Sequence, residues 1–283
     1  MLSALDPSVQ QWEEVKGNGA YIWGEGWGGS VEEADRMALS SLVSRITVAV
    51  TSEFRQVEQQ VRSSRGDEHY LMQSHRTGAY SSVTLSNTHR VVLRAGRRSH
   101  VGRWIHRDEL GTILSDRKAR VLEYEAAAFA AEESARVGDA LRYHYWAYVL
   151  LRSLQRPSEL RDSRGRMLLN TIPERLGDLL EGLDVRVKGR LGDTILLGIS
   201  YEGEPVEGLD FRYFDGARWV DGETVRGGRA SLEMAPGAPA ETVQLRIEYA
   251  YMGDALMDAE LHDTMAALEL RPLRKAFISL RTR

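Results

Sequence analysis

The glycines of the segment GEGWGG, at residues 24–29, form the clearest chemical pattern in the chain. A glycine-rich turn between a strand and a helix can bind phosphate through its backbone N–H groups. A dinucleotide fingerprint requires the spacing G-x-G-x-x-G, which would make Gly29 its third glycine in an otherwise antiparallel context. A Walker loop needs a lysine after its glycines, whereas Ser30 and Val31 follow here. The segment is therefore predicted to be a close-packed structural turn without a nucleotide cofactor.

The histidines could bind a metal ion only if several of them converged on one point. His100 and His106 share one face of a predicted strand, but an extended chain places them about 20 Å apart. The remaining histidines are scattered along the chain: His69, His75, His89, His144 and His262. No H-E-x-x-H motif accompanies them. The sequence therefore predicts no metal site.

Hydrolytic chemistry lacks a recognisable set of residues as well. Asp and Glu total 41, but no particular pair stands out as the two carboxylates of a glycosidase. The G-x-S-x-G nucleophile elbow is missing from the sequence. The chain contains no cysteine, which excludes thiolate catalysis, disulfides and cysteine-bound zinc. We therefore predict no catalytic residues and expect a protein that is not an enzyme.

Two aromatic groups could provide a binding surface instead. One group spans more than one face of a predicted helix and consists of Tyr143, Tyr145, Trp146 and Tyr148. The other group is Trp23 and Trp27, on either side of the first glycines. For both groups, packing against neighbouring parts of the protein is the favoured interpretation, and an exposed binding surface is the alternative.

The composition is that of a globular protein with a sizeable core, since 42% of the residues are hydrophobic and 28% are charged. A net charge of -4 argues against binding to nucleic acid or to anionic lipid, because both require a basic surface. Residues 1–19 lack the basic and apolar regions of a signal peptide, and no segment reaches the roughly 18 apolar residues of a spanning helix. We expect either a cytosolic protein or the mature part of an exported one.

The N-terminal third predicts a mixed α+β domain, residues 1–114. Residues 20–27 alternate as a strand does, and Ser30 with Glu33 forms a capping box for the helix that follows. One buried face of this helix is marked by Ala34, Met37, Ala38, Leu42 and Ile46. The apolar period then changes to two, which predicts a strand from Thr47. Residues 88–93 and 99–106 are expected to pair as a hairpin, so that one main helix lies on a curved antiparallel sheet.

The middle of the chain, residues 115–183, predicts a helical segment. Helices are expected over residues 116–136 and 139–154, separated by Gly138, and a third over 164–183, which Pro173 should interrupt. The first two form a helical hairpin similar to a tetratricopeptide-type pair, although no second copy follows.

Short strands separated by turns return in residues 184–283 and predict a β-sandwich-like, immunoglobulin-like domain. The clearest strands are residues 195–201, 209–214, 230–234, 243–249 and 277–281. Residues 256–270 have a helical pattern and are expected to be an insertion into this domain.

The segment 21–54 resembles a known bacterial family in several respects. Its glycines at 24 and 26, the pair Glu33-Ala34 and the ladder Ala38, Leu42 and Ile46 are similar to the twenty-kilodalton membrane-associated lipoprotein family. The related N-terminal domain of the flagellar T protein shares the pattern. The resemblance covers about the first 110 residues and implies an exported envelope protein, tethered to the outer membrane by an N-terminal lipid, with no catalytic residues. The chain departs from the family in having no lipobox cysteine, so membrane contact is expected only through a lipid anchor that this chain does not carry.

These observations lead to three functional hypotheses. The first is a non-enzymatic scaffold or accessory subunit of a periplasmic or outer-membrane assembly, which binds envelope proteins and no nucleic acid. The second is an activator of a cell-wall synthesis enzyme. The third is a carbohydrate hydrolase, which would require a deep pocket with two facing carboxylates.

Overall fold

The computed structural model describes residues 7–61, 88–154, 157–238, 242–268 and 272–281, with residues 47–61 and 267 described as backbone alone. The chain is mixed α+β, with helices and three antiparallel sheets, which confirms the predicted fold class. The described residues fall into two compact units. Unit 1 draws on Met1–Lys118, Ser153–Arg156 and Leu256–Glu269, and unit 2 draws on Ala119–Arg152, Pro157–Ala255 and Leu270–Arg283.

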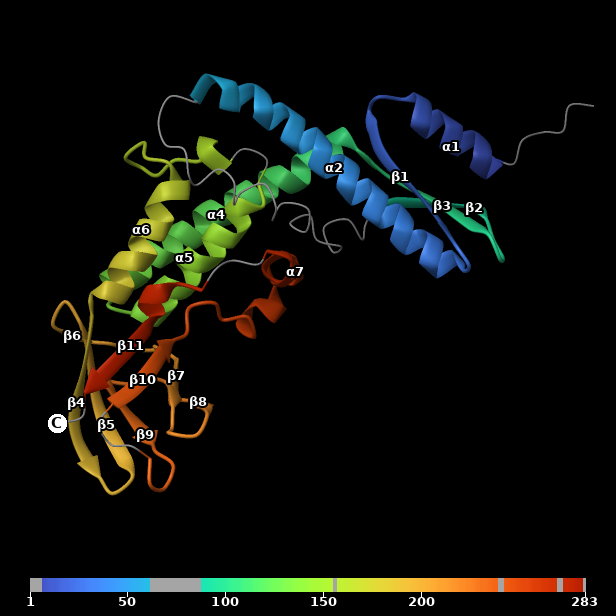
Figure 1. The fold of residues 1–283 in the computed structure, drawn as a ribbon. Coiled ribbons are helices and arrows are strands. Elements are labelled where there is room, and N and C mark those ends of the chain that lie inside the picture. The colour runs from blue at the N-terminus through green and yellow to red at the C-terminus, as the bar shows by residue number, and fades with distance from the viewer. Residues whose placement is uncertain (1–6, 62–87, 155–156, 239–241, 269–271, 282–283) are drawn as a thin grey trace, which may run out of the picture. The chain divides into compact units, whose positions relative to one another are not determined.

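Unit 1 contains a three-stranded sheet in the order β1-β3-β2 (Figure 1). Its strands are β1 (Tyr21–Gly28), β2 (His89–Arg94) and β3 (Ser99–His106). The pairing of β2 with β3 confirms the predicted hairpin, and the register joins Trp23 to Trp104 across β1 and β3. Helix α2 (Val31–Val61) packs against the face that carries the even-numbered residues of β1.

The N-terminus of α2 has the predicted cap, with one difference in its partners. The backbone N–H of Glu33 donates a hydrogen bond to the hydroxyl of Ser30 at 3.2 Å. The carboxylate of Glu33 accepts in return from the N–H of Gly29 at 2.7 Å, one residue before the expected Ser30 N–H. The cap thereby fixes the turn between β1 and α2, because both donors would otherwise lack a partner.

The strand predicted from Thr47 is wrong, because α2 continues as a helix to Val61. The alternating β-branched residues favour a strand by a small margin at most, and such preferences yield readily to context. No glycine or proline occurs between residues 31 and 61, so nothing in the sequence terminates the helix. The apolar residues Val50, Phe54, Val57 and Val61 also recur at spacings of four and three, a helical pattern.

The opposite face of the sheet is covered by α1 (Pro7–Gly17), a helix that the sequence did not predict. Its two buried residues are Trp12 and Val15, too few to produce an apolar period. The Trp12 ring lies 5.7 Å from that of Trp23 and 6.0 Å from that of Trp104, measured between ring centroids. Trp12 and Val15 thus attach the helix to the sheet, in a cluster with Val91 and Trp104.

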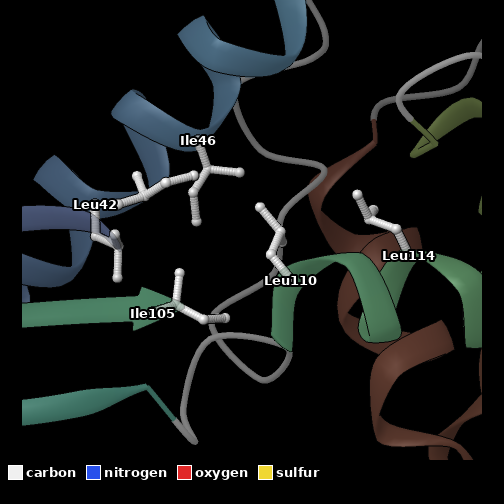
Figure 2. Close-up of a cluster of buried hydrophobic side chains, with 6 residues drawn as sticks. Leu42, Ile46, Ile105, Leu110 and Leu114 are labelled. Carbon is white, nitrogen blue, oxygen red and sulfur yellow. The ribbon is translucent and has the colours of Figure 1, made fainter. Parts of the chain in front are cut away.

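Helix α4 (Arg107–Glu133) begins directly after β3, nine residues before the predicted start at residue 116. Its first turns carry Leu110 and Leu114 into a cluster with Ile105, Leu42 and Ile46. Figure 2 shows these side chains converging from α2, the end of β3 and α4. The acidic residues Asp108 and Glu109 occupy the first turn of α4, where they interact favourably with the helix dipole. The boundary between the two units falls within this helix, after Lys118.

The helical part of unit 2 comprises α5 (Val137–Arg152), α6 (Leu168–Glu181) and the part of α4 that follows Lys118. Gly138 lies in the first turn of α5 and not between two helices, and a Cβ there would lie 2.1 Å from the carbonyl oxygen of Gly208. Pro173 does not interrupt the third helix, because α6 runs through it. It is the sixth residue of α6, past the first turn, so the helix lacks one backbone hydrogen bond there. Buried apolar residues on both sides of it, Ile172 and Leu176, favour a continuous helix nevertheless.

Two antiparallel sheets form the remainder of unit 2. One contains β4 (Leu183–Leu191), β5 (Thr194–Tyr201), β6 (Glu204–Pro205) and β9 (Arg229–Glu233), with β5 between β4 and β9. The other has the order β11-β10-β7-β8 and contains β7 (Phe211–Phe214), β8 (Trp219–Asp221), β10 (Thr242–Ile247) and β11 (Phe277–Arg281). The arrangement β4-β5-β9 beside β11-β10-β7-β8 has the strand order of an immunoglobulin-like sandwich.

Each of these sheets buries alternate residues, as a two-layer core requires. Ile195, Leu197 and Ile199 of β5 are buried, as are Val243 and Leu245 of β10. The hydroxyl of Tyr213 links the layers, because it accepts from the backbone N–H of Glu233 at 2.9 Å and donates to its carbonyl at 3.1 Å. Helix α7 (Ala259–Ala267) lies between β10 and β11 in sequence, within the predicted helical region, and its residues belong to unit 1.

Candidate functional site

The glycines of β1 pack against α2 and leave no space for a ligand on that face. A Cβ atom at Gly24 would lie 2.3 Å from the backbone nitrogen of Leu42. At Gly26 it would lie 2.1 Å from the carbonyl oxygen of Ala34, and at Gly28 it would lie 2.7 Å from the nitrogen of the same alanine. Glycine is therefore required by the close approach of strand and helix backbones. The predicted close packing is confirmed at these three positions, but the glycines lie in strand β1 and not in a turn as predicted.

The predicted separation of His100 and His106 agrees with the structure, because each has its own neighbours. His100 Nε2 lies 3.0 Å from the carboxylate of Glu25. His106 instead packs edge-on against Tyr21, with 5.2 Å between ring centroids. Across the described parts of the chain, no group of three or more His, Cys, Asp or Glu side chains is arranged so that it could hold a metal ion.

Trp27 differs from the other tryptophans of unit 1 because its side chain is largely exposed. It is 60% exposed, whereas Trp12 is 2% and Trp104 is 6% exposed. Its ring stacks on that of His100 at 4.5 Å between centroids and 11° between planes. Since Glu25 holds His100 from β1, the indole of Trp27 rests on an anchored support. Trp27 is therefore an aromatic side chain that is supported on one side by His100 and largely exposed to solvent.

Trp23, the partner of Trp27 in the sequence pattern, has a packing role. Its ring meets Trp12 edge-on, and the guanidinium of Arg45 lies 3.5 Å from its centroid. The packing interpretation thus holds for Trp23, whereas the alternative of an exposed surface describes Trp27. Strand alternation gives both residues the same face, and their neighbours distinguish them, because Trp12 of α1 and Arg45 of α2 contact Trp23.

The aromatic residues of α5 also serve packing within unit 2. Trp146 is 7% exposed, and its indole N–H donates to the carbonyl of Ala250 at 2.8 Å. The ring of Tyr145 meets that of Tyr249 edge-on at 5.0 Å, and burial raises the pKa of Tyr145. The guanidinium of Arg142 lies over the rings of Tyr143 and Trp146 and forms ion pairs with its neighbours. These contacts attach α5 to the segment that follows β10.

The helical part of unit 2 contains a charged triad that was not predicted from the sequence. His144 on α5 is fully buried, and its two ring nitrogens each lie 2.6 Å from a carboxylate of α4, Glu125 and Glu132. Burial by itself lowers the pKa of His144, but the hydrogen bonds and charges of the two glutamates outweigh it and raise that pKa. Arg175 of α6 lies 3.8 Å from the other oxygen of Glu132 and adds a cation to the group.

The sequence does contain a weak signal of this triad. Glu125 and Glu132 are seven residues apart, which places them on one face of a helix, two turns apart. His144 is the only histidine in the predicted second helix, but nothing in the sequence aligns it with that face. Both ring nitrogens are occupied by internal carboxylates, so the imidazole acts as a positively charged link between α4 and α5.

A second buried charge lies in unit 1. The side chain of Arg117 on α4 is 0% exposed and donates from Nε to Glu260 of α7 at 2.7 Å. It also donates to the hydroxyl of Ser153 at 2.9 Å. Such a bonded pair fixes the positions of the elements that it joins, since an unpaired buried guanidinium would be costly. Unlike the triad, the contact with Glu260 joins residues 143 positions apart and has no local sequence signature.

Comparison with known proteins finds no relatives, because no family model, curated protein or solved structure matches the chain. The resemblance of residues 21–54 to the lipoprotein family therefore stays a prediction. None of the helices among the described residues combines the length and the hydropathy needed to cross a bilayer.

Proposed function

We propose that this protein is a non-enzymatic component of the bacterial cell envelope, a scaffold or accessory subunit that binds a partner protein of a periplasmic or outer-membrane assembly. The observation that carries the proposal is Trp27, an exposed indole supported by His100 and Glu25. Tryptophan is enriched among the few residues that dominate protein–protein binding energies.

The geometry around Trp27 favours binding because its side chain is already held in one orientation and loses little conformational entropy when a partner binds. An exposed side chain that is free to rotate loses entropy when a partner fixes it. Trp27 is already stacked at 4.5 Å on a histidine that Glu25 holds at 3.0 Å. A partner that covers the outer face of the indole would therefore gain apolar contact at low entropic cost.

The non-enzymatic part of the proposal is supported by the uses of the most chemically suggestive residues. The glycines of β1 are in contact with the backbone of α2. The imidazole of His144 is bonded on both nitrogens, and the guanidinium of Arg117 is bonded to Glu260 and Ser153. Each of these groups has a structural role. The envelope location rests on the resemblance of residues 21–54 to the lipoprotein family.

Site-specific photo-crosslinking in the native bacterium tests the proposal. A photoreactive phenylalanine derivative replaces Trp27 in one strain, and it replaces Val92, which is 38% exposed in the same unit, in a control strain. We expect position 27 to yield a discrete adduct with an envelope protein and position 92 to yield none. Fractionation of the same cells should place the protein in the envelope.

A matched pair of substitutions then measures the energetic role of the indole. Trp27→Ala should weaken the complex with the crosslinked partner by about 2 kcal/mol or more, as expected for a binding hot spot. Met37→Ala should have little effect, because Met37 is 55% exposed and does not belong to the buried face of α2 on which the sequence placed it. A protein found only in the cytosol, or identical adducts at positions 27 and 92, would refute the proposal.

A further inference from the structure

The four-stranded sheet of unit 2 has an outer face on which aromatic and arginine side chains alternate. The register pairs Arg246 of β10 with Phe277 of β11 on one side and with Arg212 of β7 on the other. Phe214 of β7 is paired in the same way with Trp219 of β8. Residues paired across a sheet project from the same face, and the buried residues of these strands are the alternate ones. The outer face is defined by Arg212, Phe214, Trp219, Asp221, Thr242, Gln244, Arg246, Phe277, Ser279 and Arg281.

The aromatic side chains of this outer face contact one another. The Trp219 ring lies 6.1 Å from that of Phe214 and 6.4 Å from that of Phe277, measured between centroids. The second contact is edge-to-face, with 85° between the planes. Phe277 is nevertheless 50% exposed. The strands thus carry a connected apolar surface that is held in place by its own contacts and accessible to a partner.

The charges of the outer face are predominantly positive. Arg212 is neutralised by Asp221, whose carboxylate lies 2.8 Å from its Nε. Arg246 lies over the ring of Phe277 at 5.6 Å. Within the described part of the chain, neither Arg246 nor Arg281 forms an ion pair, and both are exposed. Two guanidinium groups are thus available on a chain whose net charge is -4.

We propose that this outer face binds an acidic peptide segment of a partner protein, in extended form, with an apolar side chain between two carboxylates. Arg246 and Arg281 would each bind one carboxylate, since the planar guanidinium can form two parallel hydrogen bonds with it. Thr242, which pairs with Arg281, is four residues from Arg246 along β10, or about 13 Å along the strand. The partner therefore needs acidic residues about four positions apart, with Trp219 and Phe277 available to its apolar side chain.

The arrangement favours a peptide over a nucleic acid. Proteins that bind nucleic acid neutralise many phosphates and usually have a basic surface or stripe. Two available guanidiniums and a neutralised Arg212 are too few for this, and a chain of net charge -4 does not attract a polyanion from a distance. Two specific carboxylates and one apolar side chain match the number of groups present.

This inference concerns residues of unit 2 and goes beyond the role proposed for Trp27. The two proposals can fail separately, because the experiment below does not depend on Trp27 or on the location of the protein in the cell.

The test uses fluorescence anisotropy with the full chain and a labelled synthetic peptide that has two glutamates four residues apart and a leucine midway. A second peptide has glutamine in place of both glutamates. We expect the acidic peptide to bind at least about tenfold more tightly, since charge-assisted hydrogen bonds contribute more than neutral ones. The difference should shrink as the salt concentration rises, because the charges are exposed.

Substitutions on the outer face locate the site. R246Q and R281Q should each weaken binding of the acidic peptide about fivefold to tenfold and leave the glutamine peptide unaffected. R229Q is the matched control, an exposed arginine on β9 in the other sheet of the same unit. Trp219→Ala should weaken the binding of both peptides. Circular dichroism checks that this variant is folded. The arginine variants alter exposed side chains, so they keep the test decisive if Trp219→Ala fails to fold.

Three results would overturn the proposal. One is equal affinity for the acidic and the glutamine peptides. Another is unchanged binding in R246Q and R281Q, or an equal loss in R229Q. The third is tighter binding of single-stranded oligothymidine or of polygalacturonate than of the acidic peptide, which would assign the face to a nucleic acid or to an acidic polysaccharide.

Discussion

A Cβ atom at Gly26 would lie 2.1 Å from the carbonyl oxygen of Ala34, so the strand and the helix of unit 1 are in backbone contact. Ala34 and Ala38 are both fully buried on the facing side of α2. Small residues on both elements allow the backbones of β1 and α2 to approach this closely. The contact explains the glycine pattern of β1 in terms of packing.

The first prediction follows from this contact. Gly26→Ala should destabilise the protein by about 3 kcal/mol or more, because the added methyl meets backbone atoms that cannot rotate away. Urea unfolding monitored by tryptophan fluorescence measures the change. Gly111→Ala is the control, since Gly111 lies in α4 and an added methyl there would meet no atom within 4 Å. That variant should be more stable by about 0.5–1 kcal/mol, and a similar loss in both variants would contradict the packing explanation.

The second prediction concerns the cap of α2. Ser30→Ala should cost about 1 kcal/mol of stability, because the N–H of Glu33 loses its acceptor. Glu33→Ala should cost a similar amount through the N–H of Gly29. The double variant measures whether the two bonds are coupled, and losses that simply add would show that they are independent. No loss in either single variant would contradict the cap.

The third prediction is a dependence of stability on acidic pH. Asp35 of α2 binds Arg103 of β3 through two hydrogen bonds of 2.7 and 2.9 Å. The hydrogen bond from Arg103 lowers the pKa of Asp35 below its ordinary 3.8, against the opposing effect of burial. The pair therefore contributes stability above the unfolded pKa, and this contribution is lost as the pH falls through the lower folded value.

Unfolding of Asp35→Asn at several pH values measures this contribution. At pH 7 the variant should be less stable than the wild type by about 1–3 kcal/mol, and the difference should shrink toward pH 3. Asp193→Asn serves as a control, because that carboxylate is 56% exposed and 3.9 Å from its arginine. A difference that stays constant with pH would refute the assignment.

The fourth prediction is a loss of stability as the pH rises, opposite in direction to the effect of Asp35, because the pKa of His144 is raised. The link that His144 forms with Glu125 and Glu132 requires the charged imidazolium. Its stabilising contribution is complete below the ordinary value of 6.5 and is lost as the pH rises through the higher folded pKa. His144→Gln should cost about 3 kcal/mol at pH 6 and less at alkaline pH.

Thermal or urea unfolding across this pH range provides the measurement. His89→Gln is the matched control, since His89 is 52% exposed and pairs with Glu109 at 3.4 Å. It should change stability by less than about 0.5 kcal/mol at either pH. A cost of His144→Gln that increases with pH would mean that the buried imidazole is neutral.

Local patterns in the sequence were sufficient for several elements. The cap at Ser30, the hairpin of β2 and β3 and most strands of the sandwich follow from residues close together in the chain. The strand predicted from Thr47 failed because its alternation was short and the helix before it had no terminating residue. Helix α1 was missed because only two of its residues, Trp12 and Val15, are buried, which is too few to produce an apolar period.

By itself, the sequence determined the mixed α+β class, the need for close packing at the glycines of β1 and the alternation of the sandwich strands. These features depend on backbone geometry and on spacing of a few residues. Tertiary structure alone decided which tryptophan is exposed, which glutamates meet His144 and which arginines share a sheet face with Trp219. The physical reason is that burial and charge pairing arise between residues distant in the chain. The sequence around one of these residues does not indicate which distant residue it contacts.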